Sequence, residues 1–158
     1  MIEVKNIQKS FDSKIIIQDV SAVMKAGQCN LIIGASGSGK TVLMKCMVGL
    51  FDPDHGSILY GGHDFTAMEG RDKTEIRKEI GMLFQGSALF DSQNVEQNIM
   101  FPLSMFTDWT YKKKLDRVNE VLNRVNLPDV NRKFPAELSG GMKKRVALAR
   151  AIVLNPKY

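Results

Sequence analysis

The chain has 158 residues, which is enough for one domain with a buried core. Hydrophobic residues make up 44% and charged residues 25%, ordinary values that exclude a low-complexity or disordered chain. No apolar run approaches the roughly 20 residues of a membrane span, and the N-terminus lacks a secretory signal. The net charge of +5 would suit nucleic acid, but the basic residues are dispersed and indicate solvated helix faces or phosphate-proximal charge.

The first part of the chain has the pattern of β structure. Runs at residues 2–7 and 14–24 predict two strands, joined by a turn at 10–13, and Ala26-Gly27 marks a second turn. The apolar run at residues 29–33 predicts a further strand that leads into the next motif. Cys29 and Cys46 flank that motif without metal or redox spacing, so we expect both to be small buried hydrophobes.

Residues 34–41 read Gly-Ala-Ser-Gly-Ser-Gly-Lys-Thr and match G-x-x-x-x-G-K-[ST]. The glycines lack a bulky Cβ, so the backbone can approach phosphates and turn its N–H groups toward them. Lys40 supplies a charge for the β- and γ-phosphates, and the Thr41 hydroxyl is placed to bind Mg²⁺. A flexible Gly/Ser loop is the alternative. The predicted phosphate site consists of Gly34, Ala35, Ser36, Gly37, Ser38, Gly39, Lys40 and Thr41.

The middle of the chain alternates further strands and helices. A helix is predicted over residues 41–50, a strand over 56–60, a short helix over 74–79 and a strand over 80–84. These elements predict a mixed sheet around the nucleotide. The region 96–143 has helical character, interrupted by prolines, with one apolar stripe at three- and four-residue spacing. The stripe contains Leu115, Val118, Leu122 and Val125.

A second glycine motif lies at residues 138–142, Leu-Ser-Gly-Gly-Met. Ser139 is a good N-cap, and the two glycines would let an anion approach the start of a helix. Basic side chains at 143–145 add positive charge in the first turns. A plain capped amphipathic helix would show the same pattern.

With the phosphate loop upstream, this motif resembles the signature of ABC-type ATPases, with Met142 where that family more often has Gln. The resemblance covers essentially the whole chain. It implies an α/β P-loop NTPase fold, an ABC-type nucleotide-binding domain with an N-terminal antiparallel β part and a helical subdomain. The implied divisions are a β part with a RecA-like phosphate-loop core at 1–93, the helical subdomain at 94–143 and the signature helix at 139–154.

The resemblance also implies the remaining site residues. ATP on the phosphate loop of one subunit would be capped by Ser139, Gly140 and Gly141 of another, so a homodimer of nucleotide-binding subunits is expected. Phe11 matches the family's adenine-stacking aromatic, with a core or turn aromatic as the alternative. Gln85 matches the family glutamine that reaches Mg²⁺ or water, an assignment that rests on the resemblance. ATP and Mg²⁺ are the implied cofactors.

Within the family, the chain is similar to ATPases of Mla/Mce-type lipid-trafficking systems. The similarity lies in residues 82–91, 94–98 and 101–103 and in the signature. It implies a cytoplasmic subunit, peripheral on the inner face of the bacterial inner membrane, that couples ATP hydrolysis to the transport of phospholipid or a related hydrophobic substrate. A transmembrane permease would dock on the Met- and Phe-rich segment 98–106, for which core packing is the alternative.

In the family, a strand ending in Asp-Glu, a further loop and a switch histidine follow the signature helix. Because the chain ends at Tyr158, no catalytic residue is assigned within it, and the resemblance implies an incomplete domain that is inactive alone. Two other functions remain as alternatives: a nucleotide-binding fragment without catalysis, and a non-transport ABC ATPase acting on nucleic acid. The short spacing between Lys40 and Leu138 disfavours the latter, because it leaves no room for a long coiled-coil insertion. No nucleic-acid partner is expected.

Overall fold

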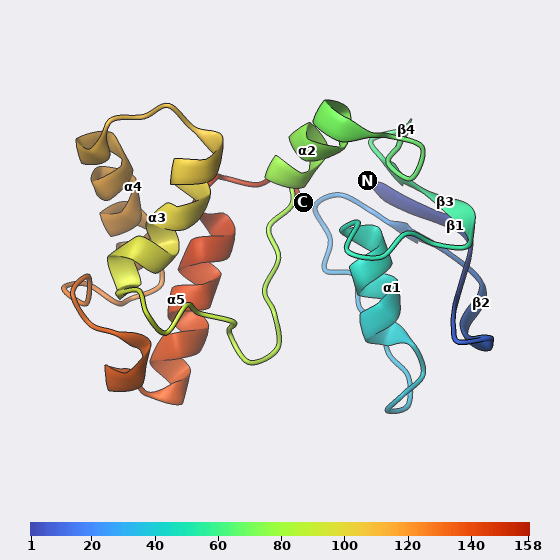
Figure 1. Cartoon of the computed structure of the whole chain (residues 1–158), viewed down its shortest axis with the longest axis horizontal. Coiled ribbons are helices and arrows are strands. Elements are labelled where there is room, and N and C mark those ends of the chain that lie inside the picture. Colours follow the sequence, from blue (N-terminus) through green and yellow to red (C-terminus); the bar gives the residue numbers. More distant parts are fainter. The chain divides into compact units, whose positions relative to one another are not determined.

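The computed structural model describes all residues, 1–158, and the chain divides into two compact units. Residues Met1–Arg77 form the first, called here the sheet unit, and Lys78–Tyr158 form the second, called here the helical unit (Figure 1). None of the helices combines the length and the apolarity that a membrane span needs.

The sheet unit contains one antiparallel sheet with strand order β2-β1-β3-β4. The strands are β1 (Ile2–Phe11), β2 (Lys14–Met24), β3 (His55–Tyr60) and β4 (His63–Asp64). The β1–β2 hairpin closes through Asp12 and Ser13, whose φ angles of 47° and 64° are both positive, as in a type I′ turn. The three strands predicted at 2–7, 14–24 and 56–60 are therefore confirmed, the first two as one long hairpin.

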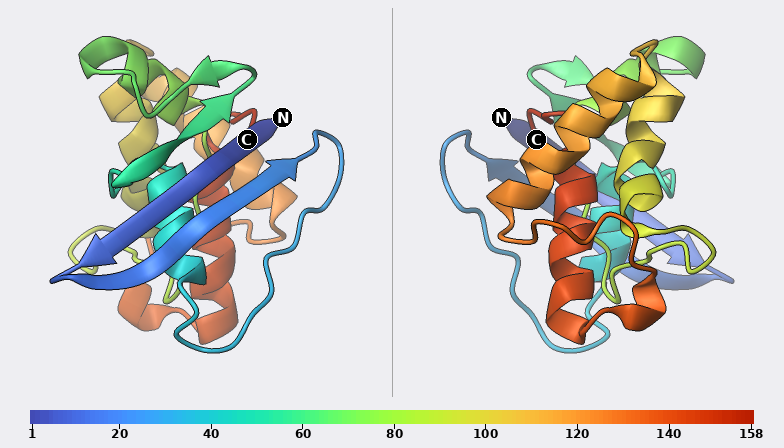
Figure 2. Two further views of the ribbon diagram at one scale, coloured as in Figure 1. Left: turned by 90° about the vertical axis from the view of Figure 1, so that its right-hand side faces the viewer. Right: turned by 90° about the vertical axis from the view of Figure 1, so that its left-hand side faces the viewer.

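Two helices complete the sheet unit, α1 (Lys40–Met47) and α2 (Gly70–Lys78), the last residue of which already belongs to the helical unit. α1 lies against one face of the sheet (Figure 2). The Tyr60 hydroxyl of β3 donates a hydrogen bond to the carbonyl of Met47, 2.8 Å away, and so holds the end of α1 to the sheet. Burial raises the pKa of the Cys46 thiol, which is packed here as a small hydrophobe, as expected. The core of this unit is formed by Val4, Ile7, Ile17, Leu43, Cys46, Met47, Ile58, Tyr60 and Phe65.

Two predicted strands do not form, and the mixed sheet is wrong. Residues 29–33 and 80–84 are irregular, and the only sheet is the antiparallel one. A parallel strand needs neighbours for its backbone N–H and C=O groups, and no strand pairs with either segment. Leu31 and Ile33 are consequently 81% exposed. Cys29 is exposed as well, contrary to the expectation that it is buried.

The helical unit packs three helices around one core (Figure 1). They are α3 (Val95–Phe106), α4 (Tyr111–Arg124) and α5 (Gly140–Ile152), with the 3₁₀ turn η1 (Pro135–Glu137) before α5. The predicted stripe on α4 is confirmed, since Val118, Leu122 and Val125 are buried and Leu115 packs against them. The core comprises Val95, Ile99, Met100, Leu103, Val118, Val121, Leu122, Val125, Leu127, Val130, Leu138, Val146, Ala149 and Val153.

Each of these three helices begins at a polar N-cap. The Asn94 side chain accepts from the Gln97 N–H at 2.9 Å, and the Gln97 side chain accepts from the Asn94 N–H at 3.0 Å, a complete capping box. α4 and α5 each have a simple hydroxyl cap: the Thr110 hydroxyl accepts from the Lys113 N–H, and the Ser139 hydroxyl accepts from the Met142 N–H. The starting points of the helices in this unit are therefore determined by local sequence.

Candidate nucleotide site

The phosphate loop is held against the sheet by its last glycine. Gly37 and Gly39 both adopt left-handed backbone conformations, with φ of 79° and 88°. A Cβ on Gly39 would lie 2.9 Å from the Ile16 carbonyl oxygen of β2, so only glycine allows this approach. The Ser38 N–H donates to the Ala35 carbonyl at 3.2 Å and closes the loop on itself. Strand β2 thus determines where the loop begins its turn into α1.

The start of α1 has the properties of an anion site. Gly39 is its N-cap and provides no side-chain acceptor, and the first turn carries no acidic residue. The Lys40 ammonium donates to the carbonyls of Gly34 and Ala35 at 2.8 and 2.7 Å, so this charge lies within the curve of the loop. Free helix N–H groups and a lysine at one point attract phosphate oxygens.

Two grooves adjoin this loop. One, of about 370 Å³, is lined by Ile16, Ile17 and Ile33 together with Ser38, Gly39 and Lys40. The other, of about 170 Å³, is lined by Ile16 and by residues 37–42, among them Thr41. Ile16 lines both grooves, but the sequence analysis did not predict it as a site residue. Its only signal was its place in the Ile15-Ile16-Ile17 run of a predicted strand.

Phe11 lies at the end of β1, outside the linings of these grooves. Its ring meets the ring of Phe51 edge-on, with centroids 5.2 Å apart, and the Lys9 ammonium lies 5.4 Å from its centroid. The side chain nevertheless remains 38% exposed. The residue is thus a packed turn aromatic with an open part, and its adenine-stacking role stays a prediction.

Gln85 belongs to the helical unit and is exposed. It precedes three left-handed residues, Gly86, Ser87 and Ala88, with φ of 82°, 70° and 46°. The buried Ser87 offers its carbonyl to the Arg150 guanidinium of α5 at 2.9 Å, and burial lowers the pKa of Arg150. The bend after Gln85 is therefore held by the signature helix.

Thr41 and Gln85, the two predicted metal ligands, lie in different units. No group of three or more His, Cys, Asp or Glu side chains that could hold a metal ion is present. The Thr41 hydroxyl alone beside a phosphate loop still fits Mg²⁺, because this ion usually takes one or two protein ligands and fills its shell with waters and phosphate oxygens.

The signature motif presents an open helix start. The Ser139 hydroxyl accepts from the Met142 N–H at 3.3 Å, and a Cβ added to Gly140 or Gly141 would meet nothing within 4 Å. Met142 instead turns inward and packs against the core of the helical unit. Arg145 does not add charge at this opening as expected, because its guanidinium donates to the Asn126 carbonyl at 2.9 Å, near the end of α4.

Comparison with known proteins decides the family. A family model described as ABC transporter matches residues 17–158. The chain belongs to the ABC transporter family. A probable ribonucleotide transport ATP-binding protein of Mycobacterium leprae is 44% identical over 156 residues, which are 99% of this chain and 45% of that protein. A methionine import ATP-binding protein of Clostridium acetobutylicum is 41% identical over 159 residues, which are 99% of this chain and 49% of that protein.

This ABC chain therefore spans about half the length of the curated relatives it matches. Among solved structures, the dimeric ABC transporter cassette MJ0796 superposes with a TM-score of 0.89 at 29% identity, covering 99% of this chain and 71% of that chain. The same cassette in a post-hydrolysis state bound to ADP and Pi gives 0.88 at 28% identity. The predicted fold, an ABC-type P-loop NTPase, is confirmed.

Proposed function

We propose that this chain is the nucleotide-binding part of an ABC transporter subunit that binds ATP with Mg²⁺ and, in the whole protein, hydrolyses it to drive transport. The observation that carries the proposal is the phosphate loop, where Lys40 and the uncapped start of α1 meet. When ATP binds, its phosphate oxygens replace the Gly34 and Ala35 carbonyls as partners of the Lys40 ammonium. The Thr41 hydroxyl would bind Mg²⁺, which neutralises charge on the β- and γ-phosphates.

The signature motif is proposed to act in trans. Its serine and glycines are exposed and sterically open, as a surface that receives a second subunit's nucleotide must be. The solved relative with a TM-score of 0.89 is described as dimeric, which supports the same assembly here. Ser139, Gly140 and Gly141 of one subunit would then contact the γ-phosphate held by Lys40 of its partner.

A transmembrane permease is the second proposed partner, bound at the inner face of the bacterial membrane. The Met- and Phe-rich segment lies in α3, which has one buried side and one exposed side. On the buried side, Ile99 and Leu103 are fully buried. Phe101, Met105 and Phe106 are 41%, 62% and 38% exposed, and Phe90 joins them with its ring centroid 5.1 Å from that of Phe101. Exposed aromatic and methionine side chains in one place suit an adaptable protein interface.

We further propose that the transported substrate is phospholipid or a related hydrophobic molecule. This proposal rests on the resemblance of residues 82–91, 94–98 and 101–103 and of the signature to lipid-trafficking ATPases. The relatives described above are named for ribonucleotide and methionine transport instead. Reconstitution of the whole protein with its permease decides among them, because stimulation of ATP turnover by methionine or ribonucleotide, and not by phospholipid, would reject the lipid proposal.

Nucleotide binding is tested directly by calorimetry with ATP and Mg²⁺. Lys40→Ala should weaken ATP binding about ten-fold or more, because a charge-assisted contact contributes about 1.5–3 kcal/mol. Lys45→Ala is the matched control, since Lys45 lies on the same helix with its ammonium over the Phe51 ring. Equal ATP affinity for the Lys40 variant and this control would reject the assignment.

A further inference from the structure

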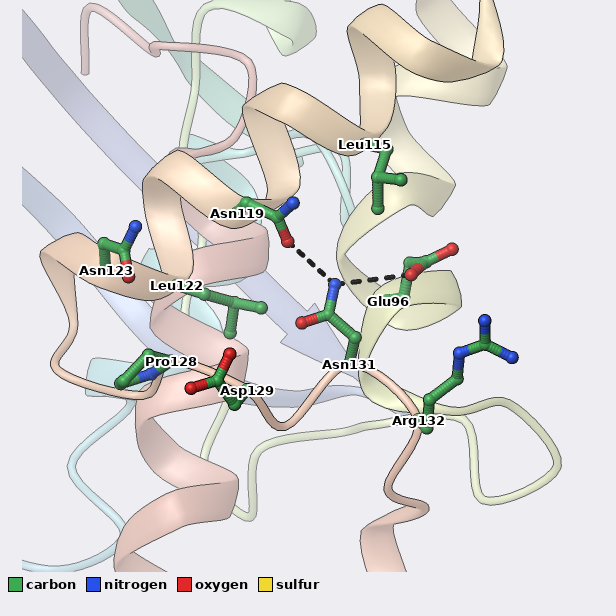
Figure 3. Close-up of a pocket in the computed structure, with 9 residues that line it drawn as sticks. All are labelled: Glu96, Leu115, Asn119, Leu122, Asn123, Pro128, Asp129, Asn131 and Arg132. Carbon is green, nitrogen blue, oxygen red and sulfur yellow. Dashed lines mark hydrogen bonds between the residues drawn. The ribbon is translucent and has the colours of Figure 1, made fainter.

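A third groove, of about 450 Å³, lies in the helical unit (Figure 3). It is bounded by the first turn of α3, by one side of α4 and by the loop at residues 128–132. Its apolar lining comes from Leu115, Leu122 and Pro128, and its polar lining is mainly amide and carboxylate groups. None of its lining residues belongs to the phosphate loop or to the signature motif.

The orientation of one amide in this groove is determined by its partners. Asn131 Nδ2 donates to Asn119 Oδ1 at 2.8 Å and to Glu96 Oε2 at 3.3 Å, which uses both of its hydrogens. Turning this amide over would place its oxygen against two acceptor oxygens. Asn131 Oδ1 is therefore held facing Leu122 and Asp129, as Figure 3 shows.

The two carboxylates of the groove differ in what they contact. Glu96 is occupied, because Oε1 accepts from the Tyr111 hydroxyl at 2.6 Å and Oε2 accepts from Asn131. Asp129 is exposed, makes no hydrogen bond or ion pair within the chain, and lies beside Leu122 (Figure 3). The only cationic lining residue, Arg132, extends away from Asp129. Beside Leu122 the groove thus offers two free acceptors, Asn131 Oδ1 and the Asp129 carboxylate, while its free donors are the side-chain amides of Asn119 and Asn123 and the Arg132 guanidinium.

We propose that this groove binds a cationic alkyl group, an ammonium or guanidinium carried on a short apolar stem. The cation would donate hydrogen bonds to the Asp129 carboxylate and to Asn131 Oδ1, which offer a negative charge and the negative end of a dipole. The stem would lie against Leu122 and Pro128, as the stems of Lys and Arg lie on apolar surfaces. The same chemistry is offered by a free amine or amino acid and by a lysine or arginine side chain of another protein.

The proposal is tested by NMR titration of the isotope-labelled chain with n-butylguanidinium and n-butylammonium. Saturable shifts are expected in the Asn131 side-chain amide and in the backbone amides of residues 129–132. n-Butanol and n-butyrate, which keep the stem and remove or reverse the charge, should give no saturable shift. Binding of all four probes with equal affinity would overturn the proposal, as would the absence of a saturable shift with either cation.

Matched variants locate the charge. Asp129→Asn should weaken n-butylguanidinium binding about ten-fold, because it removes a charge-assisted contact and keeps the shape. Asp116→Asn removes an exposed carboxylate of α4 outside the groove and should leave the affinity unchanged. Equal affinities for the two variants would overturn the assignment.

A blocked Gly-Arg-Gly peptide and free arginine distinguish the two sources of the cation. Tighter binding of the peptide indicates a protein partner, and tighter binding of the amino acid indicates a free small molecule.

Discussion

The phosphate loop and the signature motif are both glycine-rich segments that open a helix, yet their surroundings differ. The signature helix α5 begins after its N-cap Ser139, and the Val146 and Ala149 side chains of this helix are buried. The phosphate loop follows an irregular segment whose apolar side chains, Leu31 and Ile33, are 81% exposed. The difference follows from hydrogen bonding, because a helix satisfies its backbone groups within itself, whereas a strand needs a neighbour.

The largest difference between the two segments is expected in the rates of backbone amide hydrogen exchange. The backbone N–H groups of residues 31–33 donate no hydrogen bond within the chain and should exchange at rates near those of an unstructured peptide. The central amides of α5 should exchange roughly a thousand-fold more slowly or beyond, since their opening requires unfolding of the helical core. Similar protection in the two segments would contradict the contrast.

The tightness of the helical core can be measured on α3. Leu103→Ala should lower the free energy of unfolding by about 2–5 kcal/mol, because Leu103 is fully buried and leaves a cavity. Met105→Ala on the same helix removes a side chain that is 62% exposed and should change stability by less than about 0.5 kcal/mol. Denaturant unfolding of both variants gives the comparison. Comparable losses would mean that this core is not well packed.

The anchoring of the phosphate loop on β2 is a third point of comparison. Gly37→Ala should cost about 1–2 kcal/mol of unfolding free energy, since it forces a non-glycine residue into a left-handed conformation in open space. Gly39→Ala should cost more, because its Cβ would also lie 2.9 Å from the Ile16 carbonyl oxygen. Thermal unfolding of the two variants ranks them. The reverse order would show that β2 does not hold the loop.

Much of the helical unit could be predicted because its signals are local. The N-cap role of Ser139 and the α4 stripe through Val118 and Leu122 both follow from spacing and cap chemistry. The hairpin of β1 and β2 was predicted on the same grounds, from its pattern and turn residues.

The features that could not be predicted from the sequence depend on contacts between residues far apart in the chain. The strand at 29–33 fails because its formation depends on neighbours and not on its own apolar pattern. Arg145 reaches Asn126, and Ile16 reaches Gly39, through packing that no spacing rule encodes. The groove at Asn131 likewise requires α3, α4 and a loop to be assembled first.

A smaller effect is expected at the carboxylate that joins β1 to the turn before β3. The Lys9 ammonium and the Ser10 N–H, both 2.7 Å from Asp54, hold the pKa of this carboxyl below its ordinary value. A lowered pKa means that the stabilisation is present above the unfolded value of about 3.8 and is lost as the pH falls through the folded value.

Asp54→Asn should therefore lower the Tm slightly at pH 7, and the difference should close as the pH falls below 3.8. Glu69→Gln, at an exposed carboxylate without an ion pair, should show no such pH-dependent difference. Tm measured for both variants across this range checks the sign. A Tm difference between Asp54→Asn and the unaltered chain that widens as the pH falls would contradict the prediction.

The phosphate loop and the signature motif are proposed to bind one nucleotide from two subunits. Light scattering of the whole protein with ATP tests it most directly. Ser139→Arg places a large side chain at the open start of α5 and should abolish ATP-dependent dimerisation, while ATP binding to the monomer stays intact because Lys40 is untouched. If Ser139→Arg dimerises normally with ATP, or if it loses ATP binding as a monomer, the signature does not act on a partner's nucleotide and the account is wrong.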